Sequence, residues 1–318
     1  MIKPLKVENI EEAASLIDPV FRDGPYVEDA ALARRVGRDL ALKLETLNPI
    51  RSFKGRGADY FMHELAEGQR VVCASAGNFG QAVAYAGRAR GIAVTVYCAR
   101  TANPVKVARM RELGAEVVLA GADFDAAKDA ARAYADGAAD RLFVEDGEEP
   151  RISEGAGTIA VELAPLPGTL LVPVGNGALI GGIACWTKAR APRTRIVGVC
   201  AAGAPAMAES WRRNAPVSTP EARTIADGVA VRVPVPAAVD RMRGLVDDVV
   251  LVDDDQLREA LRAVRDTVGL ILEPAAALGV AAALHHDFEA GALATVVTGS
   301  NFSPELLAEL TELTPAAD

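Results

Sequence analysis

The stretch VVCASAGNFGQAVAYAGRARGIAVTVYC, residues 71–98, joins two short apolar runs through a glycine-containing turn and a longer segment. The runs 71–75 and 93–98 are nearly continuous in apolar residues, as in strands that are covered on both faces. We expect the residues between them, 78–90, to form a helix. A strand, a crossover helix and a second strand make a βαβ unit with parallel strands. The stretch therefore predicts an α/β fold.

The same alternation continues outward from this stretch along the chain. Further strands are expected at 115–120, 142–145, 169–174, 195–200 and 293–299. Further helices are expected at 104–113, 124–138, 154–164, 178–190, 255–268 and 274–286. No repeat and no low-complexity linker separates two halves, so we expect interleaved domains. The charged run EDGEEPR, 145–151, is the clearest place for the chain to cross between them.

Composition and charge exclude several classes of function. The 318 residues carry 34 basic and 43 acidic side chains, for a net charge of −9, which favours neither nucleic acid nor an anionic membrane as a partner. The four cysteines form no C-x-x-C pair, so we expect reduced core thiols and no zinc site. No secretory signal is visible at the start, which predicts a cytoplasmic protein. The uncharged stretch 163–187 contains prolines and glycines typical of a strand, a turn and a helix rather than a membrane span.

Lys54, in the segment SFKGRG at 52–57, is the first candidate functional residue. Gly55 and Arg56 follow it, and the segment has none of the acidic partners that a surface lysine usually has. One interpretation is a solvated lysine at a helix start. The other is an amine that forms a Schiff base with a carbonyl compound.

Two further segments place a glycine-containing turn between a strand and a helix, where ligands bind in open α/β sheets. The first, SAGNFGQA at 75–82, is either an N-capped turn or a site for a carboxylate. The second, VPVGNGALIGG at 172–182, has glycines that let backbone N–H groups approach a phosphate. It matches neither the P-loop pattern nor the dinucleotide fingerprint.

Taken together, these segments resemble the fold-type-II pyridoxal-phosphate enzymes, and within them the serine/threonine dehydratase (threonine ammonia-lyase) group. The resemblance implies a fold similar to that of the tryptophan synthase β-subunit, with two interleaved lobes and parallel twisted sheets. Its lysine motif is the most specific segment. The similar segments, in order, are 43–58, 75–86, 154–163, 172–184, 196–207, 224–231, 272–282 and 298–301.

The resemblance implies a pyridoxal 5'-phosphate cofactor and a role for each matching residue. Lys54 would form the Schiff base and then act as the general base, with Ser75 as a further catalytic residue. Phe53 would pack near the cofactor ring, Asn78 would bind the ring hydroxyl, and Thr298 would face the pyridine nitrogen. The residues expected to bind the phosphate are Gly175, Asn176, Gly177, Ala178 and Leu179. Those expected to bind the substrate carboxylate are Ser75, Ala76, Gly77, Asn78 and Gln81.

The sequence also departs from the family pattern. Phe79 stands where the dehydratases usually carry a histidine, and GNGAL replaces a run of four glycines. Ala76 replaces the serine of the racemase branch, which disfavours racemisation, and we expect the metal site of that branch to be absent. Glu273 is either a charge at a helix start or a carboxylate in the cofactor pocket.

The implied reaction is β-elimination from L-threonine or L-serine, which gives a 2-oxo acid and ammonia. Three alternatives stay open: a replacement or γ-elimination in the manner of threonine synthase, elimination from a different β-substituted amino acid, and a non-catalytic binding protein. The expected lobes are a large one, 1–66 and 148–318, and a small mobile one, 67–147. We also expect a homodimer and no appended effector domain.

Overall fold

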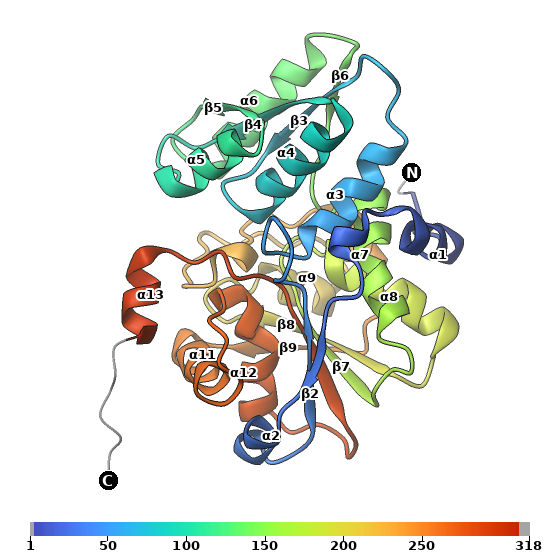
Figure 1. The fold of residues 1–318 in the computed structure, drawn as a ribbon, viewed down its shortest axis with the longest axis vertical. Helices are drawn as coiled ribbons and strands as arrows, with labels where there is room; N and C mark the ends of the chain where they lie inside the picture. The colour runs from blue at the N-terminus through green and yellow to red at the C-terminus, as the bar shows by residue number, and fades with distance from the viewer. Residues whose placement is uncertain (1–2, 312–318) are drawn as a thin grey trace.

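The computed structural model describes residues 3–311, and its strands form two sheets (Figure 1). Neighbouring strands of the larger sheet are β1 (Tyr26–Glu28), β2 (Leu40–Leu44), β10 (Leu293–Val297), β7 (Thr169–Pro173), β8 (Arg195–Ala201) and β9 (Asp248–Val252). Those of the smaller sheet are β5 (Glu116–Leu119), β4 (Ala93–Cys98), β3 (Arg70–Ala74) and β6 (Arg141–Phe143). All pairs are parallel except β1 with β2. The expected α/β class is confirmed.

Helices cover both faces of the smaller sheet, which lies above the larger one in Figure 1. One face packs against α4 (Asn78–Arg90), with α5 (Pro104–Glu112) beside it, and the other packs against α6 (Phe124–Asp136). The alanines of α6 at 127, 131 and 135 recur every fourth residue and are buried on the sheet. This spacing places them on one helix face, which explains how so polar a segment covers a strand surface.

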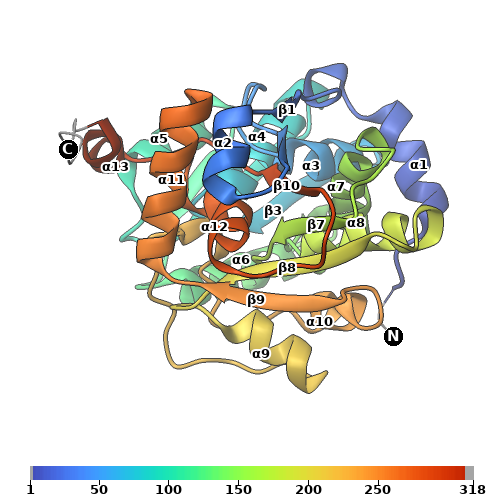
Figure 2. The same cartoon turned by 90° about the horizontal axis from the view of Figure 1, so that it is seen from below.

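Helices also cover both faces of the larger sheet (Figure 2). On one face lie α2 (Ala30–Val36), α11 (Asp254–Val268), a 3-10 turn η3 (Pro274–Ala277) and α12 (Leu278–His285). On the other lie α7 (Pro150–Glu162), α8 (Ala178–Arg190), α9 (Ala206–Arg213) and α10 (Pro236–Met242), with α1 (Val7–Leu16) packed on α7. The remaining elements are η1 (Pro19–Phe21), η2 (Asp227–Val229) and α13 (Pro304–Thr311).

The helix α3 (Lys54–His63) joins the two halves of the structure, because it packs against α4 on one side and α7 on the other. Close packing is possible where glycines face each other. A Cβ atom on Gly57 would lie 2.3 Å from the carbonyl oxygen of Ile152 in α7. The first residue of α3 is Lys54, so this packing fixes the start of the helix relative to both sheets.

Every strand and helix predicted from the sequence overlaps an element of the structure, but three strands were missed, as were the helices α1, α2, α9, α10 and α13. In β2, the run LALKL is fully buried even though it contains Lys43. The Lys43 amine bonds to the Glu162 carboxylate at 2.6 Å, which compensates its charge inside the protein. Because Lys43 interrupts the apolar run, the hydrophobic pattern of the sequence does not indicate this strand. The strands β1 and β9 were also missed.

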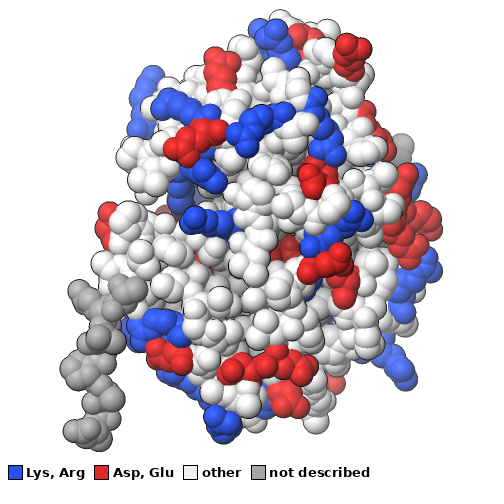
Figure 3. All heavy atoms as spheres, in the orientation of Figure 1, with Lys and Arg blue, Asp and Glu red and all other residues white. Residues whose placement is uncertain are grey.

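Within residues 3–311, no helix combines the length and apolar composition needed to cross a membrane. The four cysteines are unpaired. Cys73, Cys98 and Cys200 are buried, as predicted for core thiols, whereas Cys185 is only partly buried. Acidic and basic side chains are mixed over the face shown in Figure 3. The lobe boundaries and the mobility of the smaller lobe stay predictions.

Candidate active site

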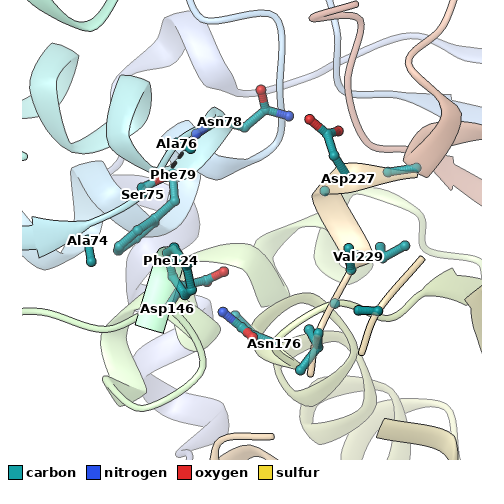
Figure 4. A pocket seen from close by; sticks show the side chains of 18 of the residues that line it. Ala74, Ser75, Ala76, Asn78, Phe79, Phe124, Asp146, Asn176, Asp227 and Val229 are labelled. Atoms are coloured by element: carbon teal, nitrogen blue, oxygen red, sulfur yellow. Dashed lines mark hydrogen bonds between the residues drawn. The ribbon is translucent and has the colours of Figure 1, made fainter. Parts of the chain in front are cut away.

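A cavity of about 830 Å³ lies where several parallel strands end. The residues that follow β3, β6, β7 and β10 all reach it, and α3 contributes its first residue. Carboxyl ends of parallel strands are where α/β folds place their ligands, because the loops there converge and helices begin there. Figure 4 shows segments from both halves of the molecule around the cavity.

All but one of the residues predicted from the sequence line this cavity. They are Phe53, Lys54, Ser75, Ala76, Gly77, Asn78, Phe79, Gly175, Asn176, Gly177, Ala178, Leu179, Glu273 and Thr298. The exception is Gln81, which lies about one turn beyond Asn78 in α4 and has a side chain only 2% exposed. The structure thus brings together residues that are separated by up to 245 positions, while the role of each stays a prediction.

Lys54 lies in the cavity wall with an acidic partner that the sequence did not reveal. Its ammonium group donates a hydrogen bond to Asp146, in the loop between β6 and α7. The Nζ atom also lies 4.7 Å from the centre of the Phe53 ring and 6.0 Å from that of Phe79. The absence of acids around Lys54 in the sequence was therefore misleading, because the acid comes from 92 residues away.

Arg56 lies two residues after Lys54 in the sequence, and the structure places its side chain among carboxylates. It is fully buried and donates hydrogen bonds to the carboxylates of Glu45 in the loop after β2 and Glu162 in α7, at 2.6–2.9 Å. Bonds of a buried guanidinium to two carboxylates hold the first turn of α3 in place. The segment SFKGRG therefore combines an anchored arginine with a lysine at the cavity.

The loop between β3 and α4 is organised by Ser75. The Ser75 hydroxyl oxygen accepts hydrogen bonds from the backbone N–H groups of Gly77, at 3.2 Å, and Gly80, at 3.0 Å. Among the described residues, the N–H groups of Asn78 and Phe79 have no protein acceptor. Free N–H groups at a helix start attract an anion, so this loop can hold a carboxylate.

Asn78 connects that loop to the other half of the molecule. Its side-chain amide donates to the two Glu273 oxygens at 2.8 and 3.1 Å. Asn301 donates its backbone N–H to Glu273, at 3.0 Å, and its amide to Asn78, at 2.9 Å. Burial raises the pKa of Glu273 to about 7, although the bonds from Asn78 and Asn301 act to lower it. Of the two interpretations of Glu273, the structure favours the carboxylate in the pocket, and Asn301 is a member that the sequence reasoning missed.

The turn between β7 and α8 presents backbone groups and the Asn176 side chain to the cavity (Figure 4). Gly177 has a φ of +84°, in the left-handed region that favours glycine. No side chain in the described part of the chain caps α8, so its first N–H groups remain available to a ligand. The helix itself is buried from Ala178 to Ala184. Such a helix start binds a phosphate through its N–H groups and its dipole.

Several cavity residues were not predicted from the sequence. Asp146 lies in the run 145–151, which was interpreted only as a crossing between lobes. Its position directly after a parallel strand was the available signal, because the loops after neighbouring strands meet at one edge. Other missed residues form ion pairs from α5 and α6 to the segment 227–232, namely Lys106 with Asp227 and Asp125 with Arg232.

The fold and the site together are those expected of one class of enzyme, a two-sheet α/β protein that uses an anionic carbonyl cofactor. The lysine, a phenylalanine ring and an uncapped helix start share one cavity, which fits a phosphorylated aromatic aldehyde. Residues 17–299 match the family model described as pyridoxal-phosphate dependent enzyme. The chain belongs to this family, and pyridoxal phosphate is its cofactor.

Three known proteins indicate where in the family the chain lies. It is 35% identical to an L-threonine ammonia-lyase of Geobacter sulfurreducens and 32% identical to one of Thermotoga maritima. Each match covers 95% of this chain and 77% of the relative. The solved structure of maize serine racemase superposes with a TM-score of 0.90 at 27% identity, covering 96% of this chain and 97% of that one.

Proposed function

We propose that the protein is a lyase that eliminates the β-hydroxyl group of L-threonine or L-serine and releases a 2-oxo acid and ammonia. The observation that carries the proposal is the position of Lys54 between two helix starts, α4 and α8, in one cavity. One helix start suits the cofactor phosphate and the other suits the substrate carboxylate. The threonine ammonia-lyases among the relatives support this reaction.

The residues that would hold the cofactor come from both halves of the structure. Lys54 would bind it covalently, the turn 175–179 would hold its phosphate, and Asn78 and Thr298 would contact its ring. When bound, pyridoxal phosphate withdraws electrons from the amino acid and so makes the Cα–H bond acidic. Thr298 has a neutral hydroxyl, which does not hold a proton on a pyridine nitrogen as a carboxylate would.

Lys54 supplies the base of the proposed reaction. Its amine, when free, accepts the proton from Cα, and the fixed start of α3 keeps that amine at the cavity. The loop 75–78 orients the substrate through its carboxylate. Ala76 itself has no hydroxyl or other titratable group. It therefore cannot return a proton to the face of Cα opposite Lys54, which favours elimination over racemisation.

The proposal extends to the lobes, the assembly and the compartment. The large lobe would comprise 1–66 and 148–318, and the small lobe, 67–147, would close over the substrate. The ion pairs Lys106–Asp227 and Asp125–Arg232 join these parts across the cavity, so they would form on closing and break on opening. We further propose a cytoplasmic homodimer.

The proposed function is tested with a visible absorption spectrum and an assay for 2-oxo acid in the same cuvette. The purified protein is loaded with pyridoxal phosphate, and L-threonine and then L-serine are added. Release of oxo acid and ammonia without a second reactant supports the lyase. A spectral change without oxo acid would instead point to a replacement reaction or to a different β-substituted substrate. A protein that shows no visible band with added cofactor would contradict the proposal.

A further inference from the structure

The acid that contacts Lys54 is not accounted for by the roles proposed so far. We propose that Asp146 is a second catalytic residue, which shares the proton taken up by Lys54 and delivers it to the leaving hydroxyl group. This inference rests on the proposed elimination reaction. It concerns one step of that reaction, the protonation of the leaving oxygen.

Asp146 has one engaged and one free carboxylate oxygen. Its Oδ2 atom accepts the hydrogen bond from Lys54 Nζ, while its Oδ1 atom is buried without a partner among residues 3–311. The residue is 8% exposed and lines the cavity. A carboxylate can bond through both oxygens at once. It can therefore contact the lysine and a ligand hydroxyl in the same cavity.

The other acidic residues of the cavity wall have partners other than Lys54. Four of them pair with arginine or lysine, and two accept N–H bonds from backbone or amide groups. The ion pairs are Glu145 with Lys128 and Arg132, Asp125 with Arg232, Asp227 with Lys106, and Glu221 with Arg223. The N–H acceptors are Asp123, which caps α6, and Glu273. Asp146 is thus distinguished by its partner, the amine proposed to accept the substrate proton.

The loop that carries Asp146 is fixed on both sides. Gly147 has a φ of +89°, and a Cβ atom there would lie 2.1 Å from the carbonyl oxygen of Asn176 in the turn 175–179. The buried guanidinium of Arg241 also donates to the carbonyl oxygens of Gly147, at 2.8 Å, and Glu148, at 2.7 Å. In Figure 4, Asp146 and Asn176 lie on the same side of the cavity. A group held in this way loses little entropy when it acts on a substrate.

The proposed proton path balances. The Cα–H bond breaks, its proton binds the Lys54 amine, and its electron pair forms the Cα=Cβ double bond as the Cβ–O bond breaks. The proton passes from the Lys54 ammonium to the Asp146 carboxylate and from there to the departing oxygen, which leaves as water. Lys54 and Asp146 return to their starting states, so the step needs no further reactant.

The test compares two substrates that differ in the leaving group, L-serine and β-chloro-L-alanine. Chloride departs without a proton, whereas hydroxide needs one. We expect Asp146→Asn to lower kcat/KM for L-serine about 100-fold and kcat/KM for β-chloro-L-alanine less than about threefold. The visible spectrum and the affinity for pyridoxal phosphate should stay unchanged. Glu148→Gln, the same change at an exposed acid of the same loop, should leave both substrates unaffected.

A second variant guards against a general loss of structure. Asp146→Ala should show the same contrast between the two substrates, and added formate should restore L-serine turnover about fivefold or more, as expected for a missing acid. An equal fall for both substrates would overturn the proposal, because Asp146 would then only position Lys54. An unchanged rate with L-serine would overturn it as well. Failure of the lyase function itself would be seen separately, as absence of 2-oxo acid with the unaltered protein.

Discussion

The cavity contains two helix starts that look alike in the sequence and differ in how they are built. Both follow a parallel strand and a glycine-containing turn, and both offer free N–H groups. The start of α8 has no side-chain cap and leads into a buried helix. The start of α4 depends on side chains: Ser75 shapes the loop, and Asn78 links it to Glu273 across the cavity.

This difference matches two kinds of anion. A cofactor phosphate stays bound through many turnovers, and a rigid turn of backbone holds it with little loss of entropy. A substrate carboxylate enters and leaves with each turnover. A loop held by exchangeable side-chain hydrogen bonds can open and re-form at that pace. We infer that α8 binds the group that stays and α4 the group that is exchanged.

The largest effect is expected from Lys54→Ala, which removes the residue between the two helix starts. The variant should lose more than about 10³-fold in kcat/KM, because both the covalent link and the base are gone. Pyridoxal phosphate should still bind weakly at the α8 turn, without the visible band of the lysine-bound form. Absorption spectroscopy and equilibrium dialysis measure the two effects. Full activity in this variant would refute the assignment of the site.

Glu273→Gln tests the hydrogen bonds between Asn78 and Glu273 through the pH dependence of the free energy of unfolding. Burial raises the pKa of Glu273 to about 7, so between the usual glutamate value of 4.5 and pH 7 the folded protein holds a proton that the unfolded chain has lost. The free energy of unfolding contributed by this group therefore falls as the pH rises through that window, by about 3 kcal/mol.

The glutamine variant lacks this titration. Urea unfolding of both proteins at several pH values gives the difference in their free energies of unfolding. This difference should decline from pH 4.5 to pH 7 and then level off. A difference that does not vary with pH would show that the carboxyl group is not perturbed as the structure indicates.

Gly177→Ala is directed at the start of α8, which has no side-chain cap. An alanine at a φ of +84° is strained, and its Cβ atom would lie 2.8 Å from that of Ala238. We expect a loss of about 2 kcal/mol in the free energy of unfolding and about a tenfold weaker affinity for pyridoxal phosphate. Gly37→Ala is the matched control, since Gly37 has a φ of +80° with no atom within 4 Å of the added Cβ. The control variant should lose stability while its affinity for pyridoxal phosphate stays unchanged.

The backbone elements of this site could be predicted from the sequence better than its side-chain pairs. The turns at 75–78 and 175–179 follow recognisable strands, so their place at one sheet edge follows from the α/β pattern. The partners could not be predicted in this way. Lys54 meets Asp146 from 92 residues away, and Asn78 meets Glu273 from 195. A local pattern states which residues are polar, but only the packing of the two sheets decides which of them meet.

The smallest effect is expected from Ser75→Ala, and it bears most directly on the contrast between the helix starts. Loss of the hydroxyl leaves the N–H groups of Gly77 and Gly80 without their acceptor, so the loop should hold the substrate carboxylate less well. We expect the KM for the substrate to rise about tenfold, with the affinity for pyridoxal phosphate unchanged. Ser303→Ala removes a comparable cap at α13, where Ser303 accepts from Leu306, and should change neither quantity. If Ser75→Ala instead weakened the cofactor and left the substrate KM unaltered, α4 would hold the resident anion, and the division between the two helix starts would have to be reversed.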